Sequence, residues 1–232
     1  MASIRKKRPR VHTSAGPRKT ATPRRKPAEL DLRRTPRQAR GQATFETILD
    51  ATATLLEHVG GERLTTNLIA RAAGVNVATL YQYFPNKQTV LLELFRRHSR
   101  TRIAALDQQL AGLSASADWR RVIGNVIQEA ADAWASTPGL AALRQVMRTS
   151  PDLLAHEQEY AKHMAATLAE ELRKAGVKRD QATLVARCAT EAVSALLDGW
   201  LIHTDRRDGR VVREAKAMVA GYLAPYLGKT RK

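Results

Sequence analysis

The pattern of apolar and polar residues becomes helical near residue 42 and stays helical to the end of the chain. Apolar residues first recur at steps of three and four, which places one stripe along an amphipathic helix: Phe45, Ile48, Leu49, Thr52, Leu55, Leu56 and Val59. Gly60-Gly61 predicts the end of that helix. Two short helices are expected at 66–73 and 76–83, with Gly74 between them. Asn86 is expected to cap a longer helix from Lys87 to about Ala111.

The second half of the chain shows only helical spacing. Asp118 can cap the first helix there, and four more are predicted at 140–148, 152–175, 180–203 and about 210–227. No stretch alternates with a period of two over the length of a strand, so the sequence predicts no sheet. The expected fold is all-α, with about nine helices in two parts.

The residues before this pattern have a different composition. Residues 1–38 are rich in Arg, Lys, Pro, Thr and Ala and contain little that could be buried, so they are expected to be disordered. The expected organisation is therefore a basic arm at 1–38, a three-helix domain at 39–86, a larger helical domain at 87–227 and a short basic tail at 228–232.

The positive charge of the chain is concentrated in the arm. The whole sequence has 39 Lys+Arg and 22 Asp+Glu, a net charge of +17, and residues 1–40 contribute +12 of it. Such a segment attracts nucleic acid or an anionic membrane surface. The single cysteine, Cys188, excludes an internal disulfide and a multi-cysteine zinc site. No apolar run approaches the ~20 residues that span a bilayer, so we expect a soluble, cytoplasmic protein without a membrane partner.

Residues 64–87, LTTNLIARAAGVNVATLYQYFPNK, carry the most informative pattern. Thr65 or Thr66 can cap the first short helix, and Gly74 permits the positive φ of a tight turn between crossed helices. The buried face of this pair is expected to contain Leu68, Ile69, Ala72, Ala73, Val75, Leu80 and Phe84, packed on Phe45, Leu49 and Leu56. This is the pattern of a helix-turn-helix whose second helix, Asn76 to Tyr83, lies in the major groove of DNA.

The outer face of the second helix is expected to carry Asn76, Val77, Ala78, Thr79, Gln82 and Tyr83. Small residues allow a close approach to base edges, and the apolar ones can touch thymine methyl groups. Asn76 and Gln82 can hydrogen-bond with bases. The side chains suited to phosphate oxygens are Thr79, Tyr81, Tyr83 and Lys87.

Residues 64–87 resemble the N-terminal domain of the tetracycline-repressor (TetR) family of transcriptional regulators, in the pattern Thr-Thr…Ile-Ala…Ala-Gly-Val…Leu-Tyr-x-Tyr-Phe-x-x-Lys. The resemblance implies DNA contacts at Thr66, Asn67, Asn76, Val77, Ala78, Thr79, Tyr81, Gln82, Tyr83 and Lys87. The chain departs from the family pattern at Asn76, where Ser is frequent, and at Ala78, where Gly is frequent. An Asn contact is therefore expected in place of a Ser hydroxyl, and the base preference stays open.

The same resemblance implies a homodimer through helices 180–203 and 210–227. Helix 180–203 has two apolar faces, one lined by Leu184, Cys188, Ala192, Ala195 and Gly199 and the other by Val185, Ala189, Val193, Leu196 and Trp200. This pattern favours burial on two sides. A helix buried within one chain would show the same pattern, so the sequence leaves both explanations open.

The resemblance further implies a ligand pocket in the C-terminal domain. Its candidate lining residues are Trp134, Met147, His156, Tyr160, His163, Met164 and Trp200, although each is also an ordinary core or surface residue type. His156, His163 and His203 lack a carboxylate pair at ligand spacing, so no metal site is predicted. The thiol of Cys188 is expected to be inert among apolar neighbours.

The leading hypothesis is a sequence-specific transcriptional regulator that needs no cofactor and binds double-stranded DNA. It is expected to act as a ligand-responsive repressor on a palindromic operator, with an unidentified small-molecule effector. The alternative is an architectural, largely nonspecific DNA-binding protein driven by the basic arm. The sequence contains no phosphate-binding glycine loop, nucleophile elbow or paired carboxylates with an acid/base partner, so neither enzyme activity nor catalytic residues are predicted.

Overall fold

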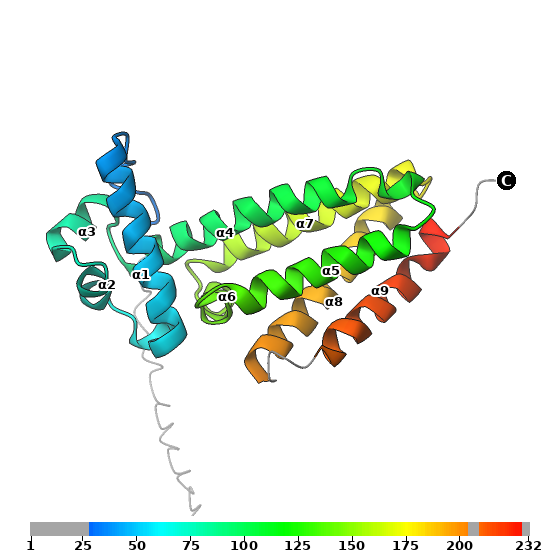
Figure 1. The fold of residues 1–232 in the computed structure, drawn as a ribbon. Helices are drawn as coiled ribbons and strands as arrows, with labels where there is room; N and C mark the ends of the chain where they lie inside the picture. Colours follow the sequence, from blue (N-terminus) through cyan, green and yellow to red (C-terminus); the bar gives the residue numbers. More distant parts are fainter. Residues whose placement is uncertain (1–27, 204–208, 229–232) are drawn as a thin grey trace, which may run out of the picture.

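The structure is a computed structural model that describes residues 28–203 and 209–228, with side chains described for 28–200 and 209–228. Residues 1–27 of the predicted arm, the predicted polar break at 204–208 and residues 229–232 of the predicted tail lie outside the described residues. Three helices stand together at one end of the molecule (Figure 1), and they are α1 (Ala39–Arg63), α2 (Thr66–Ala72) and α3 (Val77–Tyr83).

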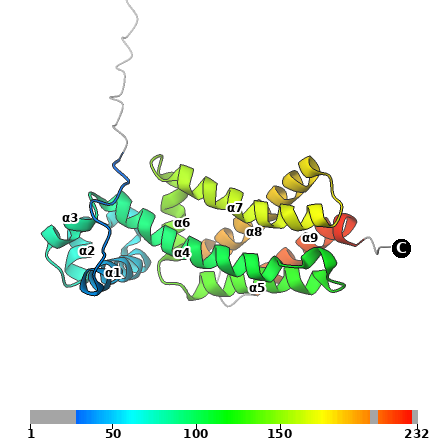
Figure 2. The same cartoon turned by 90° about the horizontal axis from the view of Figure 1, so that it is seen from above.

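The remaining helices form the larger part of the molecule. They are α4 (Lys87–Leu110), α5 (Trp119–Ser136), α6 (Leu140–Thr149), α7 (Leu154–Lys174), α8 (Arg179–His203) and α9 (Arg210–Leu227). In Figures 1 and 2, α4 leads away from the three-helix group and runs beside α5 and α7, while α8 packs against α7 and α9. The described residues contain no strand, which confirms the all-α prediction. No helix in the described ranges is long and apolar enough to cross a membrane.

The predicted helix ends are confirmed at some positions and corrected at others. Gly60 has φ +70° and forms a kink inside α1, but the helix continues to Arg63, so it ends later than the predicted Gly60-Gly61. The Asn86 Oδ1 atom accepts a hydrogen bond from the backbone N–H of Thr89 at 2.9 Å, so the predicted cap of α4 is confirmed. The predicted cap by Asp118 is wrong, because its carboxylate accepts a hydrogen bond from the Arg121 guanidinium and caps no backbone N–H.

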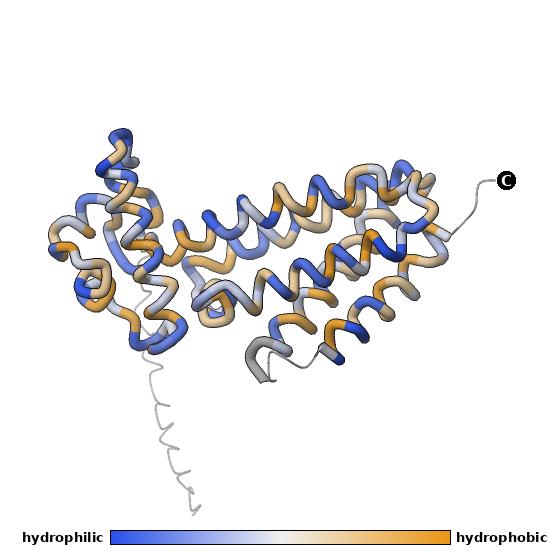
Figure 3. Tube along the Cα trace, in the orientation of Figure 1, coloured by the Kyte–Doolittle hydropathy of each residue, from blue (hydrophilic) through white to orange (hydrophobic). Residues whose placement is uncertain are grey.

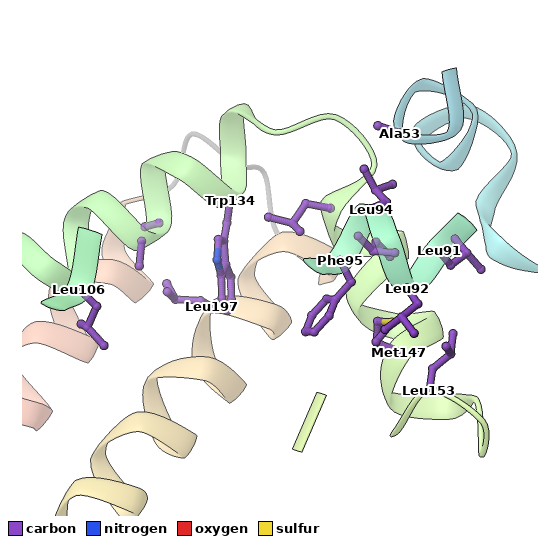
Figure 4. Close-up of a cluster of buried hydrophobic side chains, with 14 of the residues drawn as sticks. Ala53, Leu91, Leu92, Leu94, Phe95, Leu106, Trp134, Met147, Leu153 and Leu197 are labelled. Atoms are coloured by element: carbon purple, nitrogen blue, oxygen red, sulfur yellow. The ribbon is translucent and has the colours of Figure 1, made fainter. Parts of the chain in front are cut away.

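One apolar core connects the two parts of the molecule. Apolar and polar residues interchange along every long helix (Figure 3), and the apolar ones meet between the helices. Figure 4 shows Leu92 and Phe95 of α4 beside Met147 of α6, with Trp134 and Leu197 farther along the same cluster. The first turns of α4 therefore belong to the core of both parts.

A cluster of four charged side chains lies between α6, α7 and α8. The Arg144 guanidinium donates to Asp198 at 2.6 Å, and the Arg148 guanidinium donates to Glu157 at 3.1 Å and also pairs with Asp198. Arg144 also lies 3.5 Å from Glu157, and its side chain is only 5% exposed. The four charges sum to zero, so each of the three largely buried members, Arg144, Glu157 and Asp198, has a counterion, while Arg148 is partly exposed.

The three-helix part meets the larger part where α1 touches the start of α6. The Gly139 N–H donates to the Glu57 carboxylate at 2.6 Å. Gly139 has φ +68°, and a Cβ atom on it would stand 2.2 Å from the carbonyl oxygen of Ala53. Only glycine fits this contact, because any side chain would meet both a strained backbone and a neighbouring carbonyl.

We predict that Gly139→Ala lowers the free energy of unfolding by about 3 kcal/mol, the sum of a left-handed alanine and a steric clash with α1. The matched control is Gly112→Ala, because Gly112 has φ +79° but no atom lies within 4 Å of the place where its Cβ would stand. The control should cost about 1 kcal/mol. Urea unfolding measures both values, and equal losses in the two variants would contradict the contact between α1 and α6.

Candidate nucleic-acid interface

The α2–α3 pair has the predicted helix-turn-helix geometry. The Thr65 hydroxyl accepts from the N–H of Leu68 at 3.2 Å, so Thr65 rather than Thr66 caps α2. Gly74 has φ +65°, the left-handed conformation that the tight turn requires. Asn76 then caps α3, and its Oδ1 atom accepts from the N–H of Ala78 at 2.8 Å. These local bonds set the orientation of α3 relative to α2.

One side of α3 is anchored in the core by aromatic rings. Leu80 and Phe84 are fully buried, and Phe84 stacks on Phe45 with ring centroids 4.8 Å apart. Tyr83 was expected on the outer face, and this placement is wrong. Its side chain is only 8% exposed and meets the Phe45 ring edge-on at 5.9 Å, so it packs as a core residue.

The opposite side of α3 faces solvent. Asn76, Ala78 and Gln82 are exposed on it, while Val77 and Thr79 are half-buried at its margins. Asn67, on α2, is also exposed. Because the oxygen of Asn76 is occupied by the cap, the NH₂ group is the part of its amide left for another partner.

Thr66 and Tyr81 form a polar link between the two helices. Their hydroxyl oxygens lie 3.0 Å apart in a hydrogen bond, and both residues are half-buried. The link holds the first turn of α2 against α3. Both hydroxyls therefore stand together, as two predicted contacts to one phosphate group would require.

Lys87 is placed differently from the free phosphate anchor that the sequence predicted. Its Nζ atom donates to the carbonyl oxygen of Gly61 at 3.1 Å, and the side chain is half-buried. This bond satisfies one of the three N–H donors of the ammonium group. Lys87 thus connects the start of α4 to the last turn of α1, with two donors left for another partner.

The last part of the predicted arm has a defined position, which corrects the prediction of disorder for residues 28–38. The N–H of Arg33 donates to the carbonyl of Tyr83 at 2.9 Å. The Glu29 carbonyl accepts from the amide of Asn86 at 2.7 Å and from the hydroxyl of Thr89 at 2.9 Å. We call residues 28–38 the docked segment.

The docked segment places arginines beside α3 that the motif did not indicate. The Arg33 guanidinium donates to the carbonyl of Tyr81 at 3.3 Å. Arg34, Arg37 and the neighbouring Arg40 are exposed and form no ion pair within the described residues. A sequence signal for this docking did exist, because Leu30 and Leu32 interrupt the polar arm and pack on the core.

A second candidate site is a cavity of about 880 Å³ in the larger part of the molecule, between α4, α5, α7, α8 and α9. Of the predicted lining residues, Trp134, Tyr160 and Met164 lie in its wall. Met147 is fully buried on the inner side of α6, His163 is exposed, and neither His156 nor Trp200 contributes to the wall. The prediction of a lining role is corrected for these four residues.

Two family models match the chain. The model described as bacterial regulatory proteins, tetR family, matches residues 48–94, which include the helix-turn-helix. The model described as tetracyclin repressor-like, C-terminal domain, matches residues 118–223. Together with the exposed face of α3, these matches define a DNA-binding transcriptional regulator. The chain belongs to the TetR family.

The relatives and solved structures agree with this assignment. The HTH-type transcriptional regulator BetI of Cronobacter sakazakii is 30% identical over 168 residues, which are 66% of this chain and 76% of that protein. BetI of Vibrio campbellii is 28% identical over 181 residues, 76% of this chain and 88% of that protein. SmeT, the repressor of the Stenotrophomonas maltophilia multidrug efflux pump SmeDEF, shares the fold, with a TM-score of 0.60, 20% identity and coverage of 83% of this chain and 98% of SmeT.

We predict that Asn76→Ala lowers the free energy of unfolding by about 1 kcal/mol, because the variant loses the cap of α3. Asn76→Asp keeps a cap oxygen and should retain the stability of the parent chain. Urea unfolding followed by circular dichroism measures both. A loss in the Asp variant as large as in the Ala variant would contradict the capping role.

Proposed function

We propose that this chain is a ligand-responsive repressor that binds a two-fold symmetric operator as a homodimer. The observation that carries the proposal is the exposed side of α3, where small residues stand between two amides that can bond with bases. This face is held by the capped turn and by the aromatic anchor on Phe45. It can approach base edges closely without a change in the helix.

The proposed contacts to base edges come from Asn76, Ala78 and Gln82, with Val77 and Thr79 at the margins of the same face. Ala78 can meet a thymine methyl group, and Gln82 can form two hydrogen bonds with adenine. Asn67, Lys87 and the linked hydroxyls of Thr66 and Tyr81 are the proposed phosphate contacts. Tyr83 takes a supporting role, because its ring is buried.

The arginines of the docked segment extend the proposed interface beyond the two helices. Arg34 and Arg37 belong to the docked segment, whose Arg33 bonds to α3, and they are exposed without a carboxylate partner in the described residues. Exposed guanidinium groups in such a place favour phosphate oxygens, to which they donate in pairs. They would add affinity for any sequence and leave the choice of sequence to α3.

An exposed apolar face on α8 and α9 supports the proposed homodimer. Leu184 is 53% exposed, Met218 44% and Tyr222 40%, and these are the most exposed large hydrophobic side chains of the described residues. Cys188 is exposed on the same face, so its expected burial requires a second subunit. Packing this face against its copy would remove these apolar surfaces from water.

The proposed response to a ligand rests on the cavity and on α4. The Phe95 ring, in α4, meets the Tyr160 ring of the cavity wall edge-on at 5.5 Å. The same helix begins at Lys87, in the proposed DNA interface. SmeT has been solved in a complex with triclosan, so this fold can hold a small molecule.

A second candidate function is a nonspecific architectural role. The +12 charge of residues 1–40 favours binding to any DNA, and a nucleoid occlusion factor, SlmA of Marinomonas, is 28% identical over 177 residues, 71% of this chain and 84% of that protein. The exposed amides of α3 favour the regulator, since phosphate binding alone needs no such face.

We predict that selection from a random DNA pool with the full chain yields a two-fold symmetric sequence, with half-sites about one helical turn, ~34–36 Å, apart or at a multiple of it. Gln82→Ala should change the preferred base at one position in each half-site, and the exposed Gln108→Ala on α4 is the matched control. Selection of no preferred sequence would favour the architectural role, and selection of a lone half-site would contradict the dimer.

We predict that the double variant Arg34→Gln/Arg37→Gln keeps the selected sequence but binds it less tightly. The slope of log K against log salt should fall in magnitude by about 1.8, because two phosphate contacts are lost. Lys162→Gln/Lys178→Gln removes the same charge from exposed positions far along the chain and should leave the slope unchanged. Fluorescence anisotropy at several salt concentrations measures the slopes. A slope equal to that of the parent chain would remove the docked segment from the interface.

A further inference from the structure

The charges around the cavity indicate what kind of ligand it takes. Most of its wall is apolar, from Leu106 on α4 through Ile127 on α5 and Met164 on α7 to Leu197 on α8. A volume of about 880 Å³ lies within the range of cavities that hold small organic ligands. The wall also contains charged side chains, and their partners decide which charge a ligand can carry.

The carboxylates of the wall already have cationic partners. Glu157 accepts from the Arg148 guanidinium at 3.1 Å and lies 3.5 Å from Arg144. Glu191 pairs with Arg187 at 3.6 Å. A cationic ligand would have to displace an arginine to reach either carboxylate, which would leave a guanidinium group without its counterion.

The aromatic rings of the wall are occupied in the same way. The Arg144 guanidinium stands over the Trp134 ring, 4.3 Å from its centroid, where a ligand cation would otherwise bind. The Tyr160 ring is packed edge-on against Phe95. Neither rings nor carboxylates therefore provide the site that a quaternary ammonium group needs.

Arg102 is a half-buried cation of the wall, and it has no carboxylate partner within the described residues. It lies on α4 and lines the same cavity as Tyr160, close enough for its charge to act on the pKa of the Tyr160 hydroxyl. Burial raises the pKa of Tyr160, although Arg144 and Arg102 oppose the rise, so the phenol is protonated at neutral pH and has a proton to donate. Arg102 and Tyr160 thus present donors, with no negative charge between them.

We propose that the cavity binds an amphipathic monoanion, with its apolar body against the Leu106–Met164 wall and its carboxylate held by Arg102 and Tyr160. This inference rests on the proposed ligand response and adds the charge of the ligand to it. A carboxylate supplies the counterion that Arg102 lacks, and charge-assisted hydrogen bonds to it are the strong kind. The uncharged apolar body fills the remainder of the cavity without disturbing the paired arginines.

The test compares three probes with the same ten-carbon chain in calorimetric titrations of the full chain: decanoate, 1-decanol and decyltrimethylammonium. We expect decanoate to bind tightest. Arg102→Gln should lower the affinity for decanoate by about ten- to a hundred-fold, to a value similar to that for 1-decanol. Arg100→Gln removes the same charge from an exposed position of α4 outside the cavity wall, and it should leave decanoate binding unchanged.

Arg102→Lys provides a second variant that retains the charge, and it should keep the preference for decanoate over 1-decanol. Circular dichroism establishes that each variant retains its helices. Tighter binding of decyltrimethylammonium than of decanoate, or equal decanoate affinity in the Arg102→Gln and parent chains, would overturn the inference and leave the ligand response standing. Failure of all three probes to bind would overturn the proposed ligand response of this cavity as well.

Discussion

The charge cluster between α6, α7 and α8 is the constraint on which both candidate sites depend. Arg144, Arg148, Glu157 and Asp198 are matched two to two, and the Arg144 side chain is only 5% exposed. Charges removed from water are tolerated only while each has its partner, and loss of one partner typically costs about 3–5 kcal/mol. A shift of α6 along α7 or α8 would separate these pairs. The three helices are therefore held in one register.

This register determines where the three-helix part stands. The first residues of α6 touch α1 through the Gly139–Glu57 hydrogen bond and the close approach to Ala53. On the other side, the α4 helix carries Phe95 against Tyr160 and Arg102 into the cavity wall. The three-helix part, with the proposed recognition helix α3, and the cavity thus rest on two shared supports, α4 and α6. In the proposed function, a ligand that moves either support would also move the proposed DNA interface.

Much of the fold could be predicted from local signals. Glycines with positive φ and Asn side chains at helix starts act over a few residues, so Gly74 and Asn86 marked helix ends correctly and Gly60 marked the kink in α1. The turn between α2 and α3 is equally local. The prediction that Asp118 caps α5 was wrong because the Arg121 guanidinium competes with the backbone for its carboxylate. Which of these two partners the carboxylate binds depends on side-chain geometry.

The candidate sites were less predictable, because they depend on contacts between distant segments. A seven-residue helix such as α3 makes only two turns, and this pattern is too short to predict that Tyr83 packs on Phe45. Leu30 and Leu32 gave a signal for the docked segment, but its position also depends on backbone groups such as the Glu29 carbonyl, which leave no residue pattern. Likewise, the side of α7 that faces the cavity follows from its packing on α8, which placed Met164 in the wall and His163 in solvent.

The cap at Asn76 has a further consequence for recognition. An amide side chain can both donate and accept hydrogen bonds, and it can rotate to present either group to a base. Here the oxygen is committed to the N–H of Ala78, so the group that remains is a donor. In the major groove this suits the N7 atoms of purines, the O6 of guanine and the O4 of thymine, and it does not suit the amino group of cytosine. In the proposed complex, the hydrogen bond that starts the helix would therefore also restrict the bases that can stand opposite Asn76.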